Sequence, residues 1–277
     1  MKLYSWWSKY MFWEKYGFPW VEQKTKLIIG HRGSILNYPE NTFLSFDKAI
    51  EEGAKGIECD IWKSSDDEYV IIHDGTVDRT TNSTGNVSDF TLAELTSMDA
   101  GGWFDSQFAD QEDTKIPSLT GFINRYGEQD IFLNMHIKLG LTDIYNIVDI
   151  LDANNILNHC FIFAAIDSIG YVKEYNPRTF VMNASYTTPS VFLTQAENEN
   201  WNAFSTAIAN IDEDVVNITN KAGFYLQGSY ISSNFTTETQ NFIDMGVNFL
   251  LGNDCLTMVN VLTSNDIEQI TPSDWSK

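Results

Sequence analysis

Short apolar segments alternate with longer amphipathic stretches along the chain from Lys26 onward. This alternation is typical of a parallel sheet covered by helices. The apolar segments that we predict as strands are Leu27–Gly30, Gly56–Trp62, Tyr69–His73, Ile131–Lys138, Phe161–Ala165, Thr179–Asn183, Phe224–Gln227 and Phe249–Gly252, with a less marked additional candidate at Ala203–Thr206. About eight strands predict a TIM-like (β/α)8 barrel, with Tyr69–His73 pairing either within the barrel or beside it.

Helical patterns occupy the stretches between these strands. Glu40–Glu52 ends before Gly53, Thr142–Ala153 follows a predicted strand, and Asp212–Ala222 ends before Gly223. Glycine is the residue most often found just after the last turn of a helix, so both glycines are expected stops.

The segment Asp74–Leu119 breaks this rhythm, because it is rich in Thr, Asp, Gly and Asn and has only a short helical pattern at Leu92–Met98. We predict that it is a small insertion over one mouth of the barrel. A length of 277 residues suits a single barrel domain. We therefore divide the chain into an aromatic N-terminal extension, residues 1–25, and a barrel, residues 26–277, with the insertion at 74–119.

The N-terminal extension is densely aromatic but is interrupted by Ser, Lys and Glu, so it lacks the apolar core of a secretory signal peptide. No apolar run in the sequence is long enough to cross a bilayer. Trp6, Tyr10 and Trp13 would share one side of a short helix, which could cover the barrel, contact a protein partner or lie in a membrane interface. We expect a cytoplasmic protein, although the compartment and the oligomeric state stay open.

Charge is distributed unevenly. Residues 1–26 contain five Lys and two Glu, a balance of +3, which leaves −24 for the rest of a chain whose net charge is −21. Such an acidic body argues against nucleic acid as a partner, because nonspecific binding depends on Lys and Arg. It also repels anionic ligands, so a phosphate site would need local cations or a metal ion. Cys59, Cys160 and Cys255 are widely spaced and odd in number, which predicts free thiols.

Two histidines and an arginine follow predicted buried strands. His31 and Arg32 stand in IIGHRG, and His73 ends VIIH before a turn-rich segment. Catalytic side chains of a barrel gather at the carboxyl ends of its strands, so we expect all three at one rim. Histidine transfers protons near neutral pH, and the guanidinium fork of arginine suits phosphate oxygens. Taken singly, His31 and Arg32 are explained equally well as structural loop residues.

Two other strands carry charged or metal-binding side chains. In GIECDIW, Glu58 and Asp60 share one strand face. Two acids pointing into a barrel need a compensating cation, and their oxygens suit Mg²⁺, Ca²⁺ or Mn²⁺. A surface strand with solvated acids is the alternative, but the flanking residues are apolar. In IFLNMHIKLG, His136 offers an imidazole ligand on the same face as Lys138, which provides a cation for phosphate or forms a structural ion pair.

The ordered motifs HRG, PENT, GAKGIECDIW, VIIHDGTVDRTT, LAELTSMDAGGWF and IPSL resemble the glycerophosphodiester phosphodiesterase family throughout residues 28–119. After Leu119 the resemblance is sparser and rests on LNMHIK, AGFYL and GVNFLLGND. It implies a TIM-like barrel enzyme, a phosphoric diester hydrolase. Its substrate would be a glycerophosphodiester or similar small phosphodiester, cleaved to an alcohol and a phosphomonoester of the sn-glycerol 3-phosphate type with the help of a divalent metal ion.

The resemblance also implies roles for individual residues. His31 and His73 would be the general acid and base, and Trp103 and Phe104 of the insertion would shape substrate entry. The implied metal ligands are Glu58 and Asp60, and the implied phosphate contacts are Arg32 and Lys138.

The sequence departs from the family pattern at two places. His136 stands where the family usually has a third carboxylate, as in NIEIK, which favours a metal that accepts imidazole, such as Mn²⁺ or Zn²⁺. FYLQGS replaces a WTVN-like strand end, so a substrate-lining tryptophan is missing. The leading hypothesis is therefore a metal-dependent phosphodiesterase that uses His136 as a third ligand. The alternatives are a catalytically weakened or inactive barrel serving as a binding or structural module of a larger assembly, and a phospholipase D-like enzyme at a lipid surface.

Overall fold

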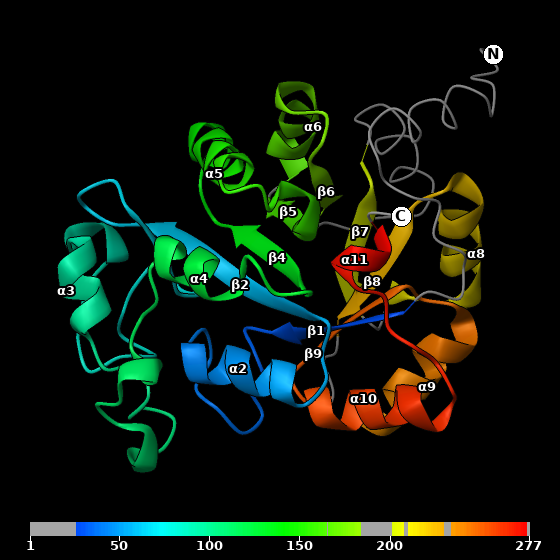
Figure 1. The fold of residues 1–277 in the computed structure, drawn as a ribbon, viewed down its shortest axis with the longest axis horizontal. Helices are drawn as coiled ribbons and strands as arrows, with labels where there is room; N and C mark the ends of the chain where they lie inside the picture. The colour runs from blue at the N-terminus through cyan, green and yellow to red at the C-terminus, as the bar shows by residue number, and fades with distance from the viewer. Residues whose placement is uncertain (1–25, 165, 184–200, 208–209, 230–233, 276–277) are drawn as a thin grey trace.

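The computed structural model describes residues 26–275 except 165, 184–200, 208–209 and 230–233. Within these residues, eight parallel strands close into a barrel, because β1 pairs with both β9 and β2 (Figure 1). The barrel strands are β1 (Leu27–His31), β2 (Gly56–Lys63), β4 (Phe132–Ile137), β5 (Cys160–Ala164), β6 (Phe180–Asn183), β7 (Ala203–Ala207), β8 (Tyr225–Ser229) and β9 (Phe249–Gly252). The predicted TIM-like (β/α)8 barrel is confirmed.

Two strand predictions have different outcomes. β3 (Tyr69–Ile71) pairs antiparallel with β2 and lies beside the barrel. Only a short turn separates it from β2, whereas a parallel neighbour requires a long crossover. The less marked candidate at Ala203–Thr206 is the true barrel strand β7. Its apolar pattern is interrupted by Ser205, whose hydroxyl accepts a hydrogen bond from the Gln227 amide at 2.7 Å inside the barrel.

Helices cover the outside of the barrel. The helices are α2 (Phe43–Glu51), α3 (Leu92–Ser97), α4 (Leu119–Tyr126), α5 (Leu141–Ala153), α6 (Ile166–Tyr175), α8 (Glu213–Ala222), α9 (Phe235–Met245), α10 (Cys255–Ser264) and α11 (Pro272–Trp275), of which α3 lies away from the barrel wall, in the segment between β3 and α4 (Figure 1). Helix α2 begins later than predicted, because Asn41 has a φ of 53° and the extended Thr42 caps the helix by accepting a hydrogen bond from the Ser45 N–H. Gly223 ends α8 in the left-handed conformation, as its position predicted.

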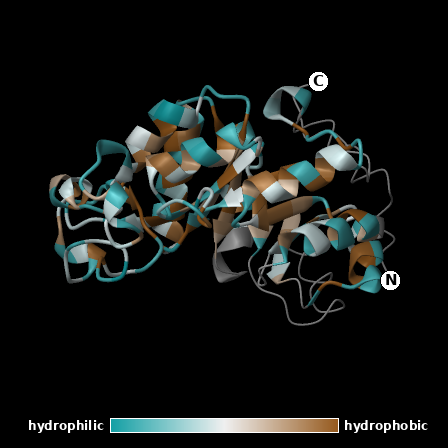
Figure 2. Cartoon of the chain, turned by 90° about the horizontal axis from the view of Figure 1, so that it is seen from below, coloured by the Kyte–Doolittle hydropathy of each residue, from teal (hydrophilic) through white to brown (hydrophobic). Residues whose placement is uncertain are grey.

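Aromatic side chains fill the barrel interior at the amino ends of its strands. The rings of Phe132 and Phe161 stack with their centroids 5.1 Å apart, and the Phe249 ring stacks on Phe161 at 5.2 Å and on Tyr225 at 5.1 Å. Apolar residues on the opposite strand faces pack against the helices, and Figure 2 shows brown strands in the middle of the molecule and helices banded in brown and teal. The interior is therefore a packed core at one end and free to hold polar groups at the other.

The segment between β3 and α4 has a small core of its own. It contains α3 and three 3-10 turns, η1 (Val87–Asp89), η2 (Ser106–Phe108) and η3 (Glu112–Thr114); a fourth, η4 (Leu157–His159), precedes β5. Its buried apolar residues pack with β3 and are Val70, Ile72, Val77, Val87, Leu95, Met98, Ala100 and Ile116. In Figure 1 this segment extends from the carboxyl end of β2. It therefore lies near the rim where we expect the functional residues.

Two further sequence expectations concern the chain as a whole. The three cysteines are buried and free, as predicted. None of the helices in the described part of the chain combines the length and the apolar character needed to cross a bilayer. The predicted aromatic helix of the N-terminal extension lies outside the described residues.

Replacing Phe249 by Ala should destabilise the barrel. The ring is fully buried between Phe161 and Tyr225, so its removal leaves a cavity that costs about 3–5 kcal/mol of unfolding free energy. Urea unfolding monitored by circular dichroism measures the loss. Leu256→Ala, at a position that is 51% exposed on α10, is the control and should cost less than about 0.5 kcal/mol. An equal effect of both substitutions would contradict a tightly packed interior.

The unfolding free energy of the protein should rise with pH as the buried Lys26 loses its proton. Its ammonium group is buried and donates to the Val247 carbonyl oxygen at 2.6 Å, and burial lowers its pKa to about 8. The unfolded chain keeps the ordinary higher pKa and binds more protons between pH 8 and about 10.5, so the unfolding free energy rises over that window by up to about 3 kcal/mol. Unfolding measured from pH 7.5 to 10.5 should show a smaller rise in Lys26→Met than in wild type. The control Lys55→Met, at an exposed position, should match wild type.

Candidate active site

A tight turn at the end of β1 brings Arg32 onto the neighbouring strand. Arg32 has a φ of 54° and Gly33 a φ of 95°, so two successive residues adopt the left-handed region. A Cβ atom at Gly33 would lie 2.2 Å from the Ser45 hydroxyl oxygen, which explains why glycine is required there. In this conformation the Arg32 backbone N–H donates to the Glu58 Oε2 at 3.0 Å. The turn therefore fixes the start of the HRG motif directly over β2.

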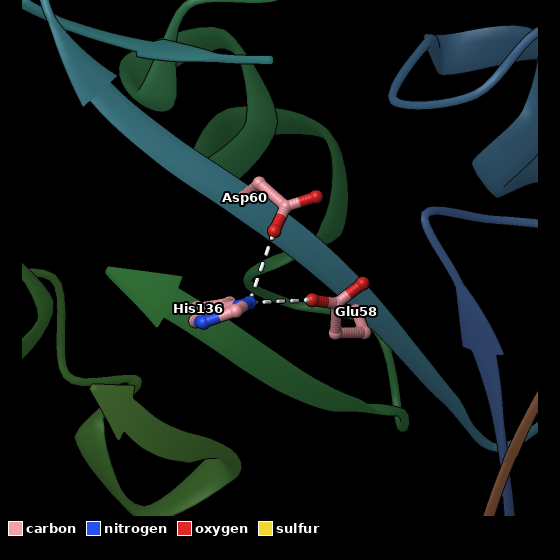
Figure 3. Close-up of side chains that lie close together, drawn as sticks. All are labelled: Glu58, Asp60 and His136. Atoms are coloured by element: carbon pink, nitrogen blue, oxygen red, sulfur yellow. Dashed lines mark ion pairs between the residues drawn. The ribbon is translucent and has the colours of Figure 1, made fainter. Parts of the chain in front are cut away.

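Glu58, Asp60 and His136 converge inside the barrel (Figure 3). The alternation along β2 turns Glu58 and Asp60 inward, and the register of β2 on β4 pairs Asp60 with His136. The His136 Nδ1 lies 3.0 Å from the Asp60 Oδ1 and 3.5 Å from the Glu58 Oε1. Both carboxylates are 1% exposed, so the alternative of a surface strand with solvated acids is wrong. Two buried negative charges this close together require positive charge beside them.

Two cationic side chains and an amide contact the Asp60 carboxylate. The Lys138 Nζ lies 3.0 Å from the Asp60 Oδ1, the Arg32 Nε lies 3.3 Å from the Oδ2, and the Asn41 side-chain amide donates to the Oδ2 at 3.0 Å. Burial alone would raise the pKa of Asp60, but the contacts with His136, Lys138 and Arg32 outweigh it and hold that pKa well below its ordinary value. Asp60 is therefore an ionised carboxylate in the folded protein.

The two carboxylates change the acid–base behaviour of His136 in turn. Burial would lower the pKa of His136, but its contacts with Asp60 and Glu58 raise it above the ordinary value. The imidazole also packs on the Phe163 ring, with centroids 4.2 Å apart, while its Nδ1 faces the two acids. His136 is thus held in place as a ligand or a proton carrier between the acids.

A chain of ion pairs connects His73 to this cluster. The His73 Nδ1 lies 2.6 Å from the Asp74 Oδ1, and the Arg79 Nε donates to the Asp74 Oδ2 at 2.6 Å. Arg79 then forms a two-point contact with Glu40 at 2.8 Å for each bond, and Glu40 accepts from the Arg32 Nη1 at 3.0 Å. The contact with Arg79, joined by that with His73, lowers the pKa of Asp74 to about 2. His73 is thereby oriented by a carboxylate that is ionised at neutral pH.

His31 reaches the same rim from β1. Its register partner on β2 is Glu58, and its Nδ1 lies 2.8 Å from the side-chain oxygen of Asn253, which directly follows β9. The seven residues proposed from the sequence for acid–base catalysis, metal binding and phosphate contact therefore lie at one end of the barrel. Direct contacts join the three candidate ligands to Arg32 and Lys138. His73 is connected to them through Asp74, Arg79 and Glu40. His31 is connected to them through the pairing of its strand with β2.

Sequence reasoning overlooked five polar residues of the site. Glu40 and Asn41 belong to the PENT motif, and Asp74 and Arg79 belong to the HDGTVDRTT motif. These side chains are charged or carry an amide and stand within motifs that resemble the family, which could have marked them as site residues. Asn253 lies in the part of the chain where the family resemblance is sparse, so only its position after a predicted strand marked it.

The donor set fits a divalent metal ion. Glu58, Asp60 and His136 each offer one ligand atom, and these atoms all lie within 4.8 Å of one another. The Asp60 Oδ1 is buried and makes no well-aligned hydrogen bond in the structure, although the Lys138 Nζ and the His136 Nδ1 each lie 3.0 Å away. An oxygen in that situation gains from coordination. The mixture of carboxylate and imidazole suits Mn²⁺ and Zn²⁺ as well as the oxygen-preferring ions.

Relatives of known name match part of this chain. The glycerophosphodiester phosphodiesterase of Caldanaerobacter subterraneus subsp. tengcongensis is 46% identical over 115 residues, which are 42% of this chain and 46% of that protein. The glycerophosphodiester phosphodiesterase of Bacillus subtilis is 34% identical over 124 residues, which are 43% of this chain and 41% of that protein. These matches thus span less than half the length of the relatives.

Solved structures match most of the chain. A glycerophosphodiester phosphodiesterase from Agrobacterium tumefaciens aligns with a TM-score of 0.75 and 24% identity, covering 86% of this chain and all of that one. An Oleispira antarctica phosphodiesterase, solved in complex with the product sn-glycerol-3-phosphate, aligns with a TM-score of 0.76 and 22% identity over 86% of this chain and 97% of that one. These likenesses support the barrel fold.

A family model also matches the sequence. The model of the glycerophosphoryl diester phosphodiesterase family matches residues 31–244, a range that contains all seven candidate site residues. Since this range is well over half of the sequence, the chain belongs to the glycerophosphoryl diester phosphodiesterase family.

Proposed function

We propose that this protein is a metal-dependent phosphodiesterase that hydrolyses a glycerophosphodiester, or a similar small phosphodiester, to an alcohol and a phosphomonoester. The observation that carries the proposal is the cluster of Glu58, Asp60 and His136 with Arg32 and Lys138 beside it. Burying paired acids together with cations contributes little to stability, because the cost of desolvating the charges is about as large as their attraction. The same groups are well suited to a metal ion and an anionic substrate.

Arg32 and Lys138 are the proposed contacts for the phosphoryl oxygens. Both side chains are mostly buried, at 16% and 19% exposure, and both already contact Asp60. In a poorly solvated site, fixed cations of this kind stabilise the charge that develops on phosphoryl oxygens. A divalent ion held by Glu58, Asp60 and His136 would add further positive charge and polarise the same oxygens.

His31 and His73 are the proposed acid–base pair. One accepts the proton of the attacking oxygen, and the other donates a proton to the leaving alcohol. Each ring is anchored through its Nδ1, His31 by Asn253 and His73 by Asp74, so each has its Nε2 available for proton transfer. Two separately anchored imidazoles are what an acid and a base acting on opposite sides of a phosphorus atom require.

The names of the relatives support the choice of substrate class. The Caldanaerobacter and Bacillus subtilis relatives are named for glycerophosphodiesters, and the Oleispira structure contains sn-glycerol-3-phosphate as product. We propose the same product class for this chain. The strongly acidic surface adds a reason for the metal, because an anionic diester must approach a molecule of net charge −21.

Histidine substitutions test the acid–base assignment. His31→Gln and His73→Gln should each lower the turnover of glycerophosphocholine and bis(p-nitrophenyl) phosphate by roughly 10²- to 10⁴-fold. His159→Gln is the matched control, because His159 precedes β5 and lies at the opposite end of the barrel. It should keep wild-type turnover. Full activity in His31→Gln or His73→Gln would remove that residue from the mechanism, and an inactive wild type would favour a binding module.

Metal removal tests the ligand assignment. EDTA should abolish turnover, and Mn²⁺, Mg²⁺, Ca²⁺ or Zn²⁺, added singly, should restore it to different degrees. By calorimetry, Glu58→Gln and Asp60→Asn should bind the restoring metal at least about tenfold more weakly than wild type. The control Glu128→Gln removes an exposed carboxylate of the same charge and should bind normally.

His136→Glu separates the two interpretations of His136. If histidine is a working ligand, the carboxylate variant should shift the metal preference toward Ca²⁺ and Mg²⁺, because it replaces a nitrogen donor with oxygen. The measurement is metal affinity together with turnover for each ion. Turnover that survives EDTA in the wild-type enzyme would contradict metal dependence altogether.

A further inference from the structure

We propose that Asn253 is a positioning residue that fixes the tautomer of His31. Asn253 follows β9 and lies beyond residues 31–244, the range that matches the family model. Its effect on catalysis rests on the proposed function, in which His31 transfers a proton. Its effect on the imidazole itself is a separate claim that does not require the protein to be an enzyme.

The contact defines which ring nitrogen carries hydrogen. The His31 Nδ1 lies 2.8 Å from the Asn253 Oδ1. An amide oxygen has only lone pairs to offer, so in this contact the Nδ1 must be the donor. A neutral imidazole then has an unprotonated Nε2 on the other side of the ring. This is the nitrogen that can accept a proton.

Asn253 is itself held firmly from both sides. Its backbone carbonyl oxygen accepts a hydrogen bond from the Leu36 N–H at 3.0 Å, and the preceding Gly252 pairs with Gly30 across β1 and β9. The next residue, Asp254, caps α10 by accepting from the Thr257 N–H at 3.0 Å. The backbone of Asn253 is thus held between a strand pair and a helix cap, which fixes the point from which its side chain reaches His31. It can therefore hold the imidazole in one orientation.

The neutral amide suits its surroundings better than a carboxylate would. His73 has the equivalent anchor in Asp74, but Arg79 offsets the charge of that acid at 2.6 Å. Within the described residues, neither a lysine nor an arginine hydrogen-bonds to the Asn253 side chain, and His31 is the register neighbour of Glu58. An acid at position 253 would add negative charge where an anionic diester has to bind. Asn253 supplies the same acceptor without that charge.

Nuclear magnetic resonance of the full chain labelled with ¹⁵N-histidine tests the tautomer directly. The chain has four histidines, and the signals of His31 are assigned by their loss in His31→Gln. At pH 8.5 in Mg²⁺, wild-type His31 should show a protonated Nδ1 and an unprotonated Nε2. In Asn253→Leu, which keeps the approximate volume but lacks the acceptor, the proton should move toward Nε2. Asn253→Asp should retain the wild-type pattern, and Asn241→Leu, at an exposed position on α9, is the control.

Kinetics with bis(p-nitrophenyl) phosphate test the consequence for proton transfer. Asn253→Leu should lower kcat by roughly 10- to 100-fold and leave KM nearly unchanged, because orientation of the base is lost and substrate contacts are kept. Asn253→Asp should recover most of kcat but raise KM, because it adds negative charge near the diester. A general loss of structure would instead lower kcat in both variants and change the circular dichroism spectrum.

Three results would overturn the proposal. A protonated Nε2 on His31 in the wild type refutes it without any variant, and so does an unchanged tautomer in Asn253→Leu. A wild-type kcat in Asn253→Leu, with the tautomer changed, refutes the role in catalysis. If the wild type is inactive, the proposed function fails while the tautomer measurement still decides the structural claim.

Discussion

Two buried carboxylates on one strand are the constraint on which this site depends. Glu58 and Asp60 are both 1% exposed and point into the same end of the barrel. The free-energy cost of that arrangement is large unless cations compensate it. The arrangement of the rim follows from this need, because the Arg32 turn, the Lys138 ammonium and the His136 imidazole all approach one or both acids. The chemistry proposed for the site uses the same groups that offset the free-energy cost of burying the two acids.

Packing of aromatic rings at the amino ends of the strands offsets the free-energy cost of the buried charges at the other end. Phe132, Phe161, Phe180 and Phe249 bury their rings at the amino ends of the strands, where no charged group of the site competes with them. The strands are therefore held in fixed register before any ligand binds. Because register decides which side chains face inward, the core indirectly sets the distance between Asp60 and His136. Stability and function are thus separated along the barrel axis.

Much of the fold and the site could be predicted from the sequence, since each depends on local patterns. Alternation along GIECDIW correctly predicted that Glu58 and Asp60 share one face, and His31 lies at the end of β1 as predicted, whereas β3 ends at Ile71, two residues before His73. Tyr69–Ile71 was ambiguous, because its apolar pattern does not reveal that a short turn forces antiparallel pairing. The roles of Glu40 and Arg79 could not be predicted, because their contacts join positions 39 residues apart through side-chain geometry.

The sharing of Glu40 by two arginines has a consequence for engineering. Arg32 belongs to the β1 turn, whereas Arg79 belongs to the segment that follows β3, and one carboxylate that is only 8% exposed holds both. Exchanging that segment for the equivalent loop of a relative would delete Arg79 together with Asp74. Glu40 would then keep a single partner and His73 would lose its anchor. A successful loop graft must therefore carry both residues with it, at their original spacing from His73.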